Sequence, residues 1–599
     1  MVVIGNPPYN MGQMNENDNN KNRRYPVIDQ RIRETYSKDS RATLNNKLYD
    51  PYVKFFRWAL DRLQGRDGIV CFVSNNSFVD QIAFDGMRKH LMQDFTHIYH
   101  LDLHGNVRKN PKLSGTTHNV FGIQVGVGIT IAIRASQSTT HALYYYRVPE
   151  FWRRKEKLDF LADKGGIPQI GWKTLQPDAK YTWLTEGMRT EFDGFIPLGA
   201  KETKQAQSIN AEAIFKMYSL GVVTSRDEWV YDFSGTRLRE KMQRFIQNYN
   251  AEVFRLSQSA APPPEHKDEF ASFMDNFVNN DPHFLKWTDR LKEALAKGQM
   301  LRFDEAKIRH SLRRPFCKQF LYFDHLLNQR RYQQHIIFPT SAAEAENIAI
   351  WLKVGSEWPM FALAANTIPD LLPQGGSQCF PYYTYAEDGS NRRENIIDWA
   401  LTQFQTHYGE QVTKRDIFHY VYVILHHPQY RQRYAENLKR ELPRIPILKD
   451  RAAFDTCVLI GKLLMELHLH YEQAQEYPLT WLENRDVPVN WYVKKMKLTA
   501  DKNTLEVNEW LTLADIPQAC FQYRLGNRSA LEWVIDQYQV STDKRSGITS
   551  DPNRLDDEQY IVRLVGKVIT VSVETVRLVN ELAQAVTQED WSQSDKSQG

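Results

Sequence analysis

The first residues of the chain, Val2-Val3-Ile4-Gly5-Asn6-Pro7-Pro8-Tyr9, decide how the rest is interpreted. The apolar triplet predicts a short buried strand, and the residues after it predict a rigid turn. Two consecutive prolines supply carbonyl oxygens but no N–H donors, and they hold the backbone extended. The side-chain carbonyl of Asn6 and the backbone carbonyl of Pro7 would therefore form a fixed pair of acceptors for an amino group. Tyr9 would add an aromatic face for a planar ring.

Helical and strand-like patterns alternate in the residues that follow. Residues 52–63 place apolar groups at helical spacing, and Gly65 follows where a helix C-cap is useful. Residues 68–74 form a continuous β-prone run, typical of a strand buried on both faces. Further elements are expected as a helix at 84–95 and strands at 98–103 and 122–134. The polar stretch 10–46 predicts a mobile loop that orders on a partner. The alternation indicates an α/β sheet covered by helices.

Changes in pattern divide the chain into three predicted regions. The first, residues 1–205, carries the α/β alternation. The second, residues 206–335, is a connecting, mainly helical region with a helix at 236–248 and a segment rich in basic and aromatic residues. The third, residues 336–599, mixes short strands near 336–338 with helices at 416–426 and 452–469. A length of 599 residues is ample for several domains.

Composition excludes several classes of protein. The 76 Lys and Arg nearly balance the 72 Asp and Glu, so net charge alone names no partner. The 5 cysteines contain no CxxC pair, which argues against a disulfide framework or a zinc ribbon and suits a reducing cytoplasm. No run approaches the ~18 apolar residues of a membrane helix. We expect a cytoplasmic protein that does not bind membranes and holds no metal; the spaced histidines His97, His100 and His104 are interpreted as structural.

Several segments together resemble a known family. Asn6-Pro7-Pro8-Tyr9 resembles motif IV of the DNA adenine methyltransferases that modify the exocyclic amino nitrogen. Residues 50–59 and 68–78 are similar to the helix, strand and loop that follow in those enzymes, and residues 119–127 to a later segment that supplies a second aromatic wall. The pattern of type I single-polypeptide (type ISP) restriction-modification enzymes is matched further on, at residues 214–227, 311–316, 378–381 and 441–446. The resemblance covers almost the whole chain.

The resemblance implies an α/β fold in which a partial Rossmann-like methyltransferase sheet precedes a mixed α+β target-recognition domain. It implies base flipping in double-stranded DNA, followed by transfer of a methyl group from S-adenosylmethionine to adenine. Asn6, Pro7, Pro8 and Tyr9 would form the catalytic motif, and Tyr9 and Phe121 would stack on the flipped base at about 1–3 kcal/mol each.

The sequence also departs from that family. Its members carry, before the Asn-Pro-Pro-Tyr segment, a glycine-containing turn and an acidic residue that hold S-adenosylmethionine, and still further upstream a helicase motor and a nuclease. Only Met1 precedes Val2 here, so cofactor-binding residues cannot be named, and a separate upstream polypeptide with these parts is the expected partner. A truncated product is the alternative. A second function also stays open, namely a catalytically silent DNA-binding or specificity fragment. A sheet without its first strands would expose apolar edges.

Two basic stretches are candidates for contact with DNA phosphates, although solvated helix faces explain such runs equally well. Both lie downstream of the catalytic motif and interleave cationic with aromatic or apolar residues. The candidate residues are Arg309, Arg313, Arg314, Lys318, Arg330, Arg331, Lys439, Arg440 and Arg444.

Overall fold

The computed structural model describes residues 1–8, 25–42, 46–107, 113, 117–200, 211–259, 262–355, 358–372, 376–587 and 590. The chain forms two compact units. Unit 1 comprises residues 1–189, 355–357 and 436–441, and unit 2 comprises residues 190–354, 358–435 and 442–599. The predicted boundary between residues 335 and 336 therefore lies within unit 2. No helix in the described ranges is long and apolar enough to cross a membrane.

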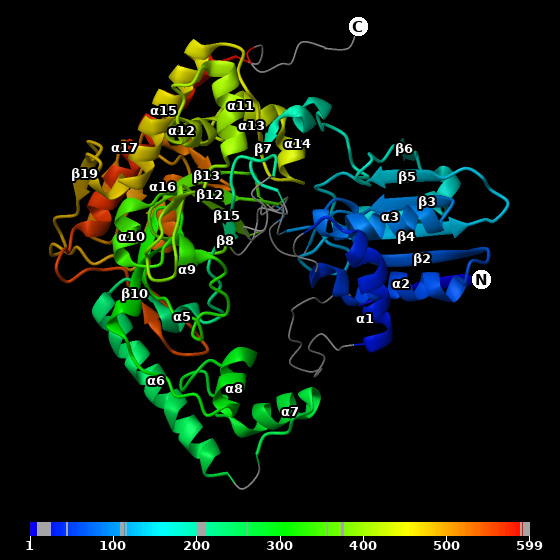
Figure 1. The fold of residues 1–599 in the computed structure, drawn as a ribbon, viewed down its shortest axis with the longest axis horizontal. Coiled ribbons are helices and arrows are strands. Elements are labelled where there is room, and N and C mark those ends of the chain that lie inside the picture. Colours follow the sequence, from blue (N-terminus) through cyan, green and yellow to red (C-terminus); the bar gives the residue numbers. More distant parts are fainter. Residues whose placement is uncertain are drawn as a thin grey trace. The chain divides into compact units, whose positions relative to one another are not determined.

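A mixed six-stranded sheet forms the centre of unit 1, in the order β1-β2-β4-β3-β5-β6. Figure 1 shows the arrows of β5, β3, β4 and β2 stacked in this order. β1 is parallel to β2, β3 is parallel to β5, and β4 runs antiparallel between β2 and β3. The strands are β1 (Val2–Gly5), β2 (Gly68–Asn75), β3 (His97–Asp102), β4 (Val127–Arg134), β5 (Ala142–Arg147) and β6 (Lys173–Leu175).

Helices α1 (Pro26–Ile32), α2 (Pro51–Leu63) and α3 (Asp85–Asp94) pack on one face of this sheet. Asp50 accepts the Tyr52 N–H and caps α2, and the helix ends where Gln64 and Gly65 adopt positive φ, as the sequence predicted for Gly65. Phe56 of α2 contacts Phe72 of β2 edge to face, with 5.0 Å between the ring centroids. Helix α4 (Arg154–Lys164) lies on the other face, where Phe160 and Leu161 pack beside β3 and β5.

Unit 2 is larger and has two four-stranded sheets at its centre. Their orders are β14-β10-β11-β9 and β13-β12-β15-β8. The strands are β8 (Ser219–Leu220), β9 (Tyr231–Asp232), β10 (Ile308–Arg314), β11 (Cys317–Tyr322), β12 (Ala349–Lys353), β13 (Ala362–Ala365), β14 (Ile368–Pro369) and β15 (Ser377–Pro381). A third sheet, β19-β22-β21-β20, consists of β19 (Thr480–Glu483), β20 (Lys497–Leu498), β21 (Leu505–Glu506) and β22 (Leu511–Ala514).

Helices surround these sheets. They include α5 (Asp227–Val230), α6 (Gly235–Ser257), α7 (Lys267–Phe277), α8 (Asp289–Ala296), α11 (Asp398–Tyr408), α12 (Lys414–Ile424), α15 (Arg451–Leu469), α16 (Ala530–Gln537) and α17 (Tyr560–Ala585). Helix α12 is buried along most of its length and packs between α11 and α15. A continuous apolar core joins α16 and α17 to the third sheet. The predicted α/β class, with a sheet covered by helices before a mixed region of helices and short strands, is confirmed.

Three local predictions were wrong. Residues 336–338 were expected as a strand but lie at the end of the short helix α9 (Gln334–Ile337). The strand expected at 122–134 begins only at Val127, because residues 122–126 belong to a loop described below. Within the expected loop 10–46, α1 and a π-helical turn (Arg33–Ser37) are ordered by burial of Ile32 and Tyr36 in the core of unit 1.

Candidate active site and DNA-binding residues

The predicted catalytic residues Asn6, Pro7 and Pro8 follow β1, the edge strand of the sheet in unit 1. Because β1, β2, β3 and β5 run in the same direction, their carboxyl ends meet at one edge of the sheet. Asn6 follows β1, Asn76 follows β2, and Asp102 ends β3. In open α/β sheets, ligands bind outside the carboxyl ends of the strands. We name these residues, together with the loop that carries Phe121, the carboxyl edge.

Asn6 is an exposed polar residue on a fixed backbone. Gly5 lies against Phe72, where an added Cβ would come within 3.3 Å of the ring, and Pro7 is buried. The Asn6 side chain is exposed and has no hydrogen-bond partner among the described residues. Its carbonyl oxygen is therefore accessible, and its role as an acceptor for a ligand stays a prediction. Pro8, which follows Asn6 and Pro7, is exposed, and Tyr9 lies outside the described residues.

A buried asparagine holds the loop that carries Phe121. The Asn119 side chain donates to the carbonyls of Gly105 (3.1 Å) and Val125 (2.7 Å) and accepts the N–H groups of Phe121 (2.9 Å) and Ile123 (3.4 Å). Asn119 is fully buried, whereas Phe121 is 46% exposed. The arrangement fixes the backbone on both sides of an exposed aromatic ring, which is the geometry that stacking on a planar ligand requires.

A buried carboxylate joins three strands of the carboxyl edge. Asp102 accepts from the Asn76 side chain (2.5 Å), the Tyr145 hydroxyl (2.8 Å), Arg147 Nε (3.0 Å) and the His104 backbone N–H (2.8 Å). Burial alone would raise the pKa of Asp102, but Arg147 and His104 lower it to about 2. Asp102 is therefore ionised at neutral pH, and both of its oxygens accept hydrogen bonds. The hydrogen bond from Asn76 links the end of β2 to the end of β3.

The histidines His97, His100 and His104 do not come together as a ligand set. His100 is fully buried, bonds through Nδ1 to the Thr130 hydroxyl (2.9 Å) and stacks on Tyr145 with 5.9 Å between ring centroids. Burial lowers the pKa of His100 to about 4, so the ring is neutral at pH 7. In the described part of the chain, no group of three or more metal-ligating side chains lies together.

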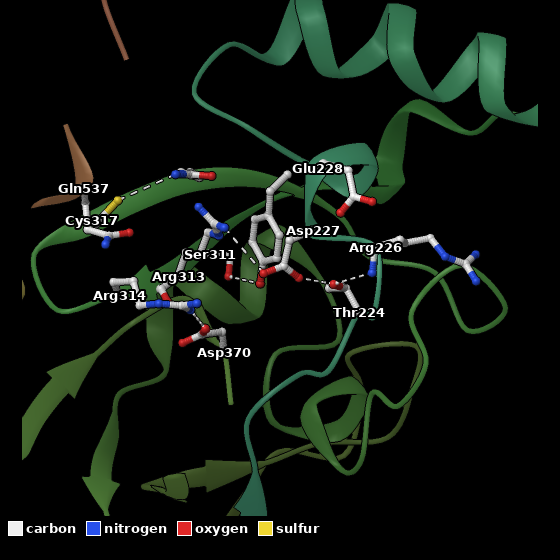
Figure 2. Close-up of polar contacts among 12 residues, drawn as sticks. Thr224, Arg226, Asp227, Glu228, Ser311, Arg313, Arg314, Cys317, Asp370 and Gln537 are labelled. Carbon is white, nitrogen blue, oxygen red and sulfur yellow. Dashed lines mark hydrogen bonds and ion pairs between the residues drawn. The ribbon is translucent and has the colours of Figure 1, made fainter. Parts of the chain in front are cut away.

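Two of the candidate DNA-binding arginines lie in an ion-pair cluster of unit 2 (Figure 2). Arg313 pairs with Asp227 (3.4 Å) and lies over the ring of Tyr231, and Arg314 pairs with Asp370. Burial acts to raise the pKa of Asp227, but Arg313 and the Thr224 hydroxyl lower that pKa below its ordinary value. These guanidinium groups hold β10, α5 and β14 together, and their charges are balanced within the unit.

The remaining candidates divide by exposure. Arg309, Lys318 and Arg440 are largely buried and paired with Glu344, Glu472 and Glu436 respectively. Arg330 and Lys439 are exposed; Lys439 pairs with Glu436, and Arg330 has no ion pair in the described ranges. Arg331, which lies over the Phe323 ring, and Arg444, which donates to the carbonyl of Asp193, are half-buried. Whether any of the nine contacts DNA stays a prediction.

Sequence reasoning did not single out Asn76, Asp102 or Asn119 as individual residues. Asn76 and Asp102 are 26 positions apart, and Asn119 bonds residues on both sides of its own loop. No periodicity or spacing marks such contacts. The only available signal was that Asn76 and Asn119 fall in segments that resemble methyltransferase motifs.

Comparison with known proteins gives matches to family models and to solved structures. The model of the Type ISP C-terminal specificity domain matches residues 213–564, and that of the Eco57I restriction-modification methylase matches residues 1–107. No curated protein matches.

Three solved structures are similar over 97% of the chain. A nuclease-deletion mutant of the Type ISP restriction-modification enzyme LlaGI, in complex with a DNA substrate mimic, is 34% identical with a TM-score of 0.84. The DrdV–DNA complex is 39% identical with a TM-score of 0.83. The ATP-dependent Type ISP restriction-modification enzyme LlaBIII, bound to DNA, is 30% identical with a TM-score of 0.85. The chain spans 52%, 56% and 37% of these proteins, respectively.

Proposed function

Because the chain belongs to the Type ISP restriction-modification family, we propose that it forms the adenine-binding and target-recognition part of a DNA methyltransferase. The proposed reaction transfers a methyl group from S-adenosylmethionine to the exocyclic amino group of adenine at a specific DNA sequence. The observation that carries this proposal is Asn6-Pro7 at the carboxyl edge, where an exposed amide carbonyl without an internal partner follows a fixed strand. The match of residues 1–107 to a methylase model supports it.

The proposed role of Asn6 and Pro7 is to hold the amino group of a flipped adenine. An adenine in duplex DNA must leave the stack before its amino nitrogen can react, at a cost of a few kcal/mol. The Asn6 side-chain carbonyl and the Pro7 backbone carbonyl accept the two N–H groups and draw the nitrogen toward tetrahedral geometry. Its lone pair is then available for the methyl group. Catalysis of this kind depends on positioning and on fixed dipoles.

The proposed role of Phe121, and of Tyr9 in the predicted motif, is to stack on the flipped ring. Stacking on an aromatic side chain contributes about 1–3 kcal/mol per base and offsets the cost of flipping. Asn119 fixes the backbone around Phe121, so the ring loses little freedom when a base arrives. Pro8 keeps the backbone extended between Pro7 and Tyr9.

The described residues fit an aminated base better than they fit the methyl donor. A carboxylate that binds ribose hydroxyls must have free oxygens, and the buried Asp102 of the carboxyl edge is engaged by Asn76, Tyr145, Arg147 and the His104 N–H. We therefore assign no described residue to S-adenosylmethionine, which supplies the methyl group when bound. The proposed holder is the part of the relatives that this chain does not span.

Most of the proposed target-recognition part lies in unit 2, because residues 213–564 match the specificity-domain model and all of them except 355–357 and 436–441 belong to that unit. Among the candidate residues, Arg330 and Lys439 are exposed, so they are the better candidates for phosphate contacts. Such contacts position the protein on DNA and make affinity fall with salt. With cellular DNA as substrate, the protein would act in the cytoplasm.

The test is the product formed by the reconstituted enzyme. The chain is combined with a polypeptide that supplies the part of the relatives which this chain does not span. The mixture is incubated with S-adenosylmethionine and duplex DNA, and the DNA is digested to nucleosides for mass spectrometry. N6-methyladenine is the expected product. Methylated cytosine in its place would overturn the adenine assignment, and sequence-specific DNA binding without any methylation would favour the silent specificity fragment.

A further inference from the structure

The residues that follow β5 and begin α4 leave the sheet at the carboxyl edge of unit 1. Because β5 is parallel to β3, its last residue Arg147 lies at the same edge as Asp102, and the Val148 N–H donates to the Asp102 backbone carbonyl (3.1 Å). Three side chains that follow are exposed. We name them the basic-aromatic group: Phe151, Arg153 and Arg154.

Hydrogen bonds hold this part of the chain against the loop that carries Phe121. They join the Arg154 N–H to the Thr117 carbonyl (3.0 Å), His118 Nδ1 to the Trp152 carbonyl (3.3 Å), and the Lys157 ammonium to the His118 carbonyl (2.5 Å). Lys157 is fully buried, so its ammonium group needs this bond. Residues 117–118 directly precede Asn119, which fixes the backbone around Phe121. The basic-aromatic group and Phe121 therefore belong to one fixed surface.

The fold does not account for the two guanidinium groups. Arg153 and Arg154 are exposed, and neither has an ion pair in the part of the chain that the structure describes. Glu156 accepts the backbone N–H of Arg153 (2.7 Å) and caps the start of α4. Cations at the start of a helix are disfavoured by the helix dipole, so these two arginines do not stabilise α4. A ligand with negative charge would give them a role.

The composition of the group indicates which anion fits. Phe151 is 58% exposed and Phe121 is 46% exposed, so the same surface presents two aromatic rings beside two guanidinium groups. Cationic groups that follow a sugar–phosphate backbone, interleaved with aromatic rings that stack on bases, are the usual means of holding a nucleic-acid strand outside the duplex stack. The planar fork of arginine matches the oxygens of a phosphate.

We propose that the basic-aromatic group binds the DNA strand that carries the flipped adenine, with Arg153 and Arg154 on its phosphates and Phe151 on a neighbouring base. The inference rests on the proposed function and deepens it. A flipped base stays joined to its strand, so a base that stacks on Phe121 brings its flanking phosphates to the same edge. The carboxylate of S-adenosylmethionine is the competing ligand for the two arginines.

The first measurement is the DNA affinity of the full chain at several salt concentrations, with a fluorescent duplex of random sequence as the probe. The double variant Arg153→Ala/Arg154→Ala should lower the slope of log affinity against log salt by about 2, and weaken binding about tenfold. The matched control is Arg62→Ala/Arg66→Ala, which removes two exposed arginines before the start of β2, at the opposite edge of the sheet. The control should keep the wild-type slope.

Two further variants separate charge from stacking. Phe151→Ala should weaken binding about fivefold without changing the salt slope, because stacking releases no counterions. Arg153→Lys/Arg154→Lys keeps both charges and should keep the slope, with an affinity between those of the wild type and the alanine variant, because lysine lacks the bidentate fork. If the alanine variant does not fold, a lysine variant with wild-type affinity would overturn the inference.

The second measurement distinguishes DNA from the methyl donor. In the reconstituted enzyme, the double alanine variant should raise the KM for DNA about tenfold and leave the KM for S-adenosylmethionine unchanged. A raised KM for S-adenosylmethionine with an unchanged salt slope would assign the arginines to the carboxylate of the donor and overturn the inference. An unchanged slope with an unchanged KM for DNA would also overturn it.

Nucleoside analysis of the wild-type product keeps this test apart from the test of the proposed function. A lower salt slope in the double alanine variant, without N6-methyladenine from the wild-type enzyme, would keep the DNA contact and reject the proposed function. N6-methyladenine from the wild-type enzyme, with an unchanged slope in the variant, would keep the proposed function and reject the contact.

Discussion

The carboxyl edge of unit 1 and the ion-pair cluster of unit 2 use polar side chains in opposite ways. Asn6 is exposed and has no partner among the described residues, whereas Arg313 and Arg314 are paired with Asp227 and Asp370. Both regions stood out in the sequence as candidate binding sites. The difference shows that local charge density in the sequence does not distinguish a polar group that is available to a ligand from one that the fold has already paired.

The largest expected effect tests the structural side of this comparison. Arg314→Ala would leave Asp370, which is 5% exposed, as an uncompensated buried charge. We expect the free energy of unfolding to fall by about 3–5 kcal/mol, measured by chemical denaturation. A loss below about 1 kcal/mol in unfolding free energy, together with weaker DNA binding, would show that Arg314 contacts DNA and does not mainly stabilise the fold.

The buried His100 beside the carboxyl edge gives a pH dependence. Its pKa is about 4 in the folded chain and 6.5 ordinarily, so the unfolded state binds the proton more tightly. The folded state keeps the full benefit of a neutral His100 above pH 6.5, and it loses that benefit as the pH falls toward 4. Between pH 7.5 and pH 5 this residue should cost about 2 kcal/mol of unfolding free energy.

The comparison variant for that prediction is His100→Gln, which cannot titrate. Unfolding is measured for both proteins across the same pH range. The wild-type protein should lose about 2 kcal/mol more than the variant. Equal losses would show that His100 is not held neutral by burial.

Asn119→Ala tests the residue that holds the loop of Phe121 in place while leaving the exposed Asn6 and Phe121 side chains unchanged. The substitution removes the hydrogen bonds to Gly105, Phe121, Ile123 and Val125 inside a buried loop. We expect a loss of about 1–3 kcal/mol in unfolding free energy and slower methylation by the reconstituted enzyme. Asn119→Asp keeps the acceptor for Phe121 and should recover part of the rate; no recovery would contradict the positioning role.

The smallest effect concerns Arg330, which is exposed and has no ion pair in the described ranges. Arg330→Ala should change the unfolding free energy by no more than about 0.5 kcal/mol. If Arg330 contacts phosphate, the slope of log affinity against log salt should fall by about 1, measured by DNA titration at several salt concentrations. An unchanged slope would remove Arg330 from the interface.

Much of the α/β framework could be predicted from the sequence. The continuous run at β2 and the helical spacing at α2 and α15 gave elements within one or two residues of their observed ends. The strand before Asn6 was also predicted, although only Val3 of the triplet packs on the core. These features follow from local periodicity, because one face of each element must be buried.

Pairing of charges could not be predicted. Arg313 and Asp227 are 86 positions apart, and Arg314 and Asp370 are 56 apart. Acidic residues that are close in the sequence are therefore not the ones that neutralise these arginines; Asp227 and Asp370, which do so, are distant in the sequence. The same limit hid the bonds of Asn119, which hold residues 119–125 in a loop and delay the start of the predicted strand to Val127.

The most direct test of the account is the single-turnover rate of DNA methylation by the reconstituted enzyme with Asn6→Ala. The matched control is Gln137→Ala, which removes an exposed amide in the turn between β4 and β5, at the opposite edge of the same sheet. We expect Asn6→Ala to slow methylation by about 10²–10³-fold with unchanged DNA affinity, and the control to retain the wild-type rate. Undiminished methylation by Asn6→Ala would contradict the assignment of the carboxyl edge as the catalytic site.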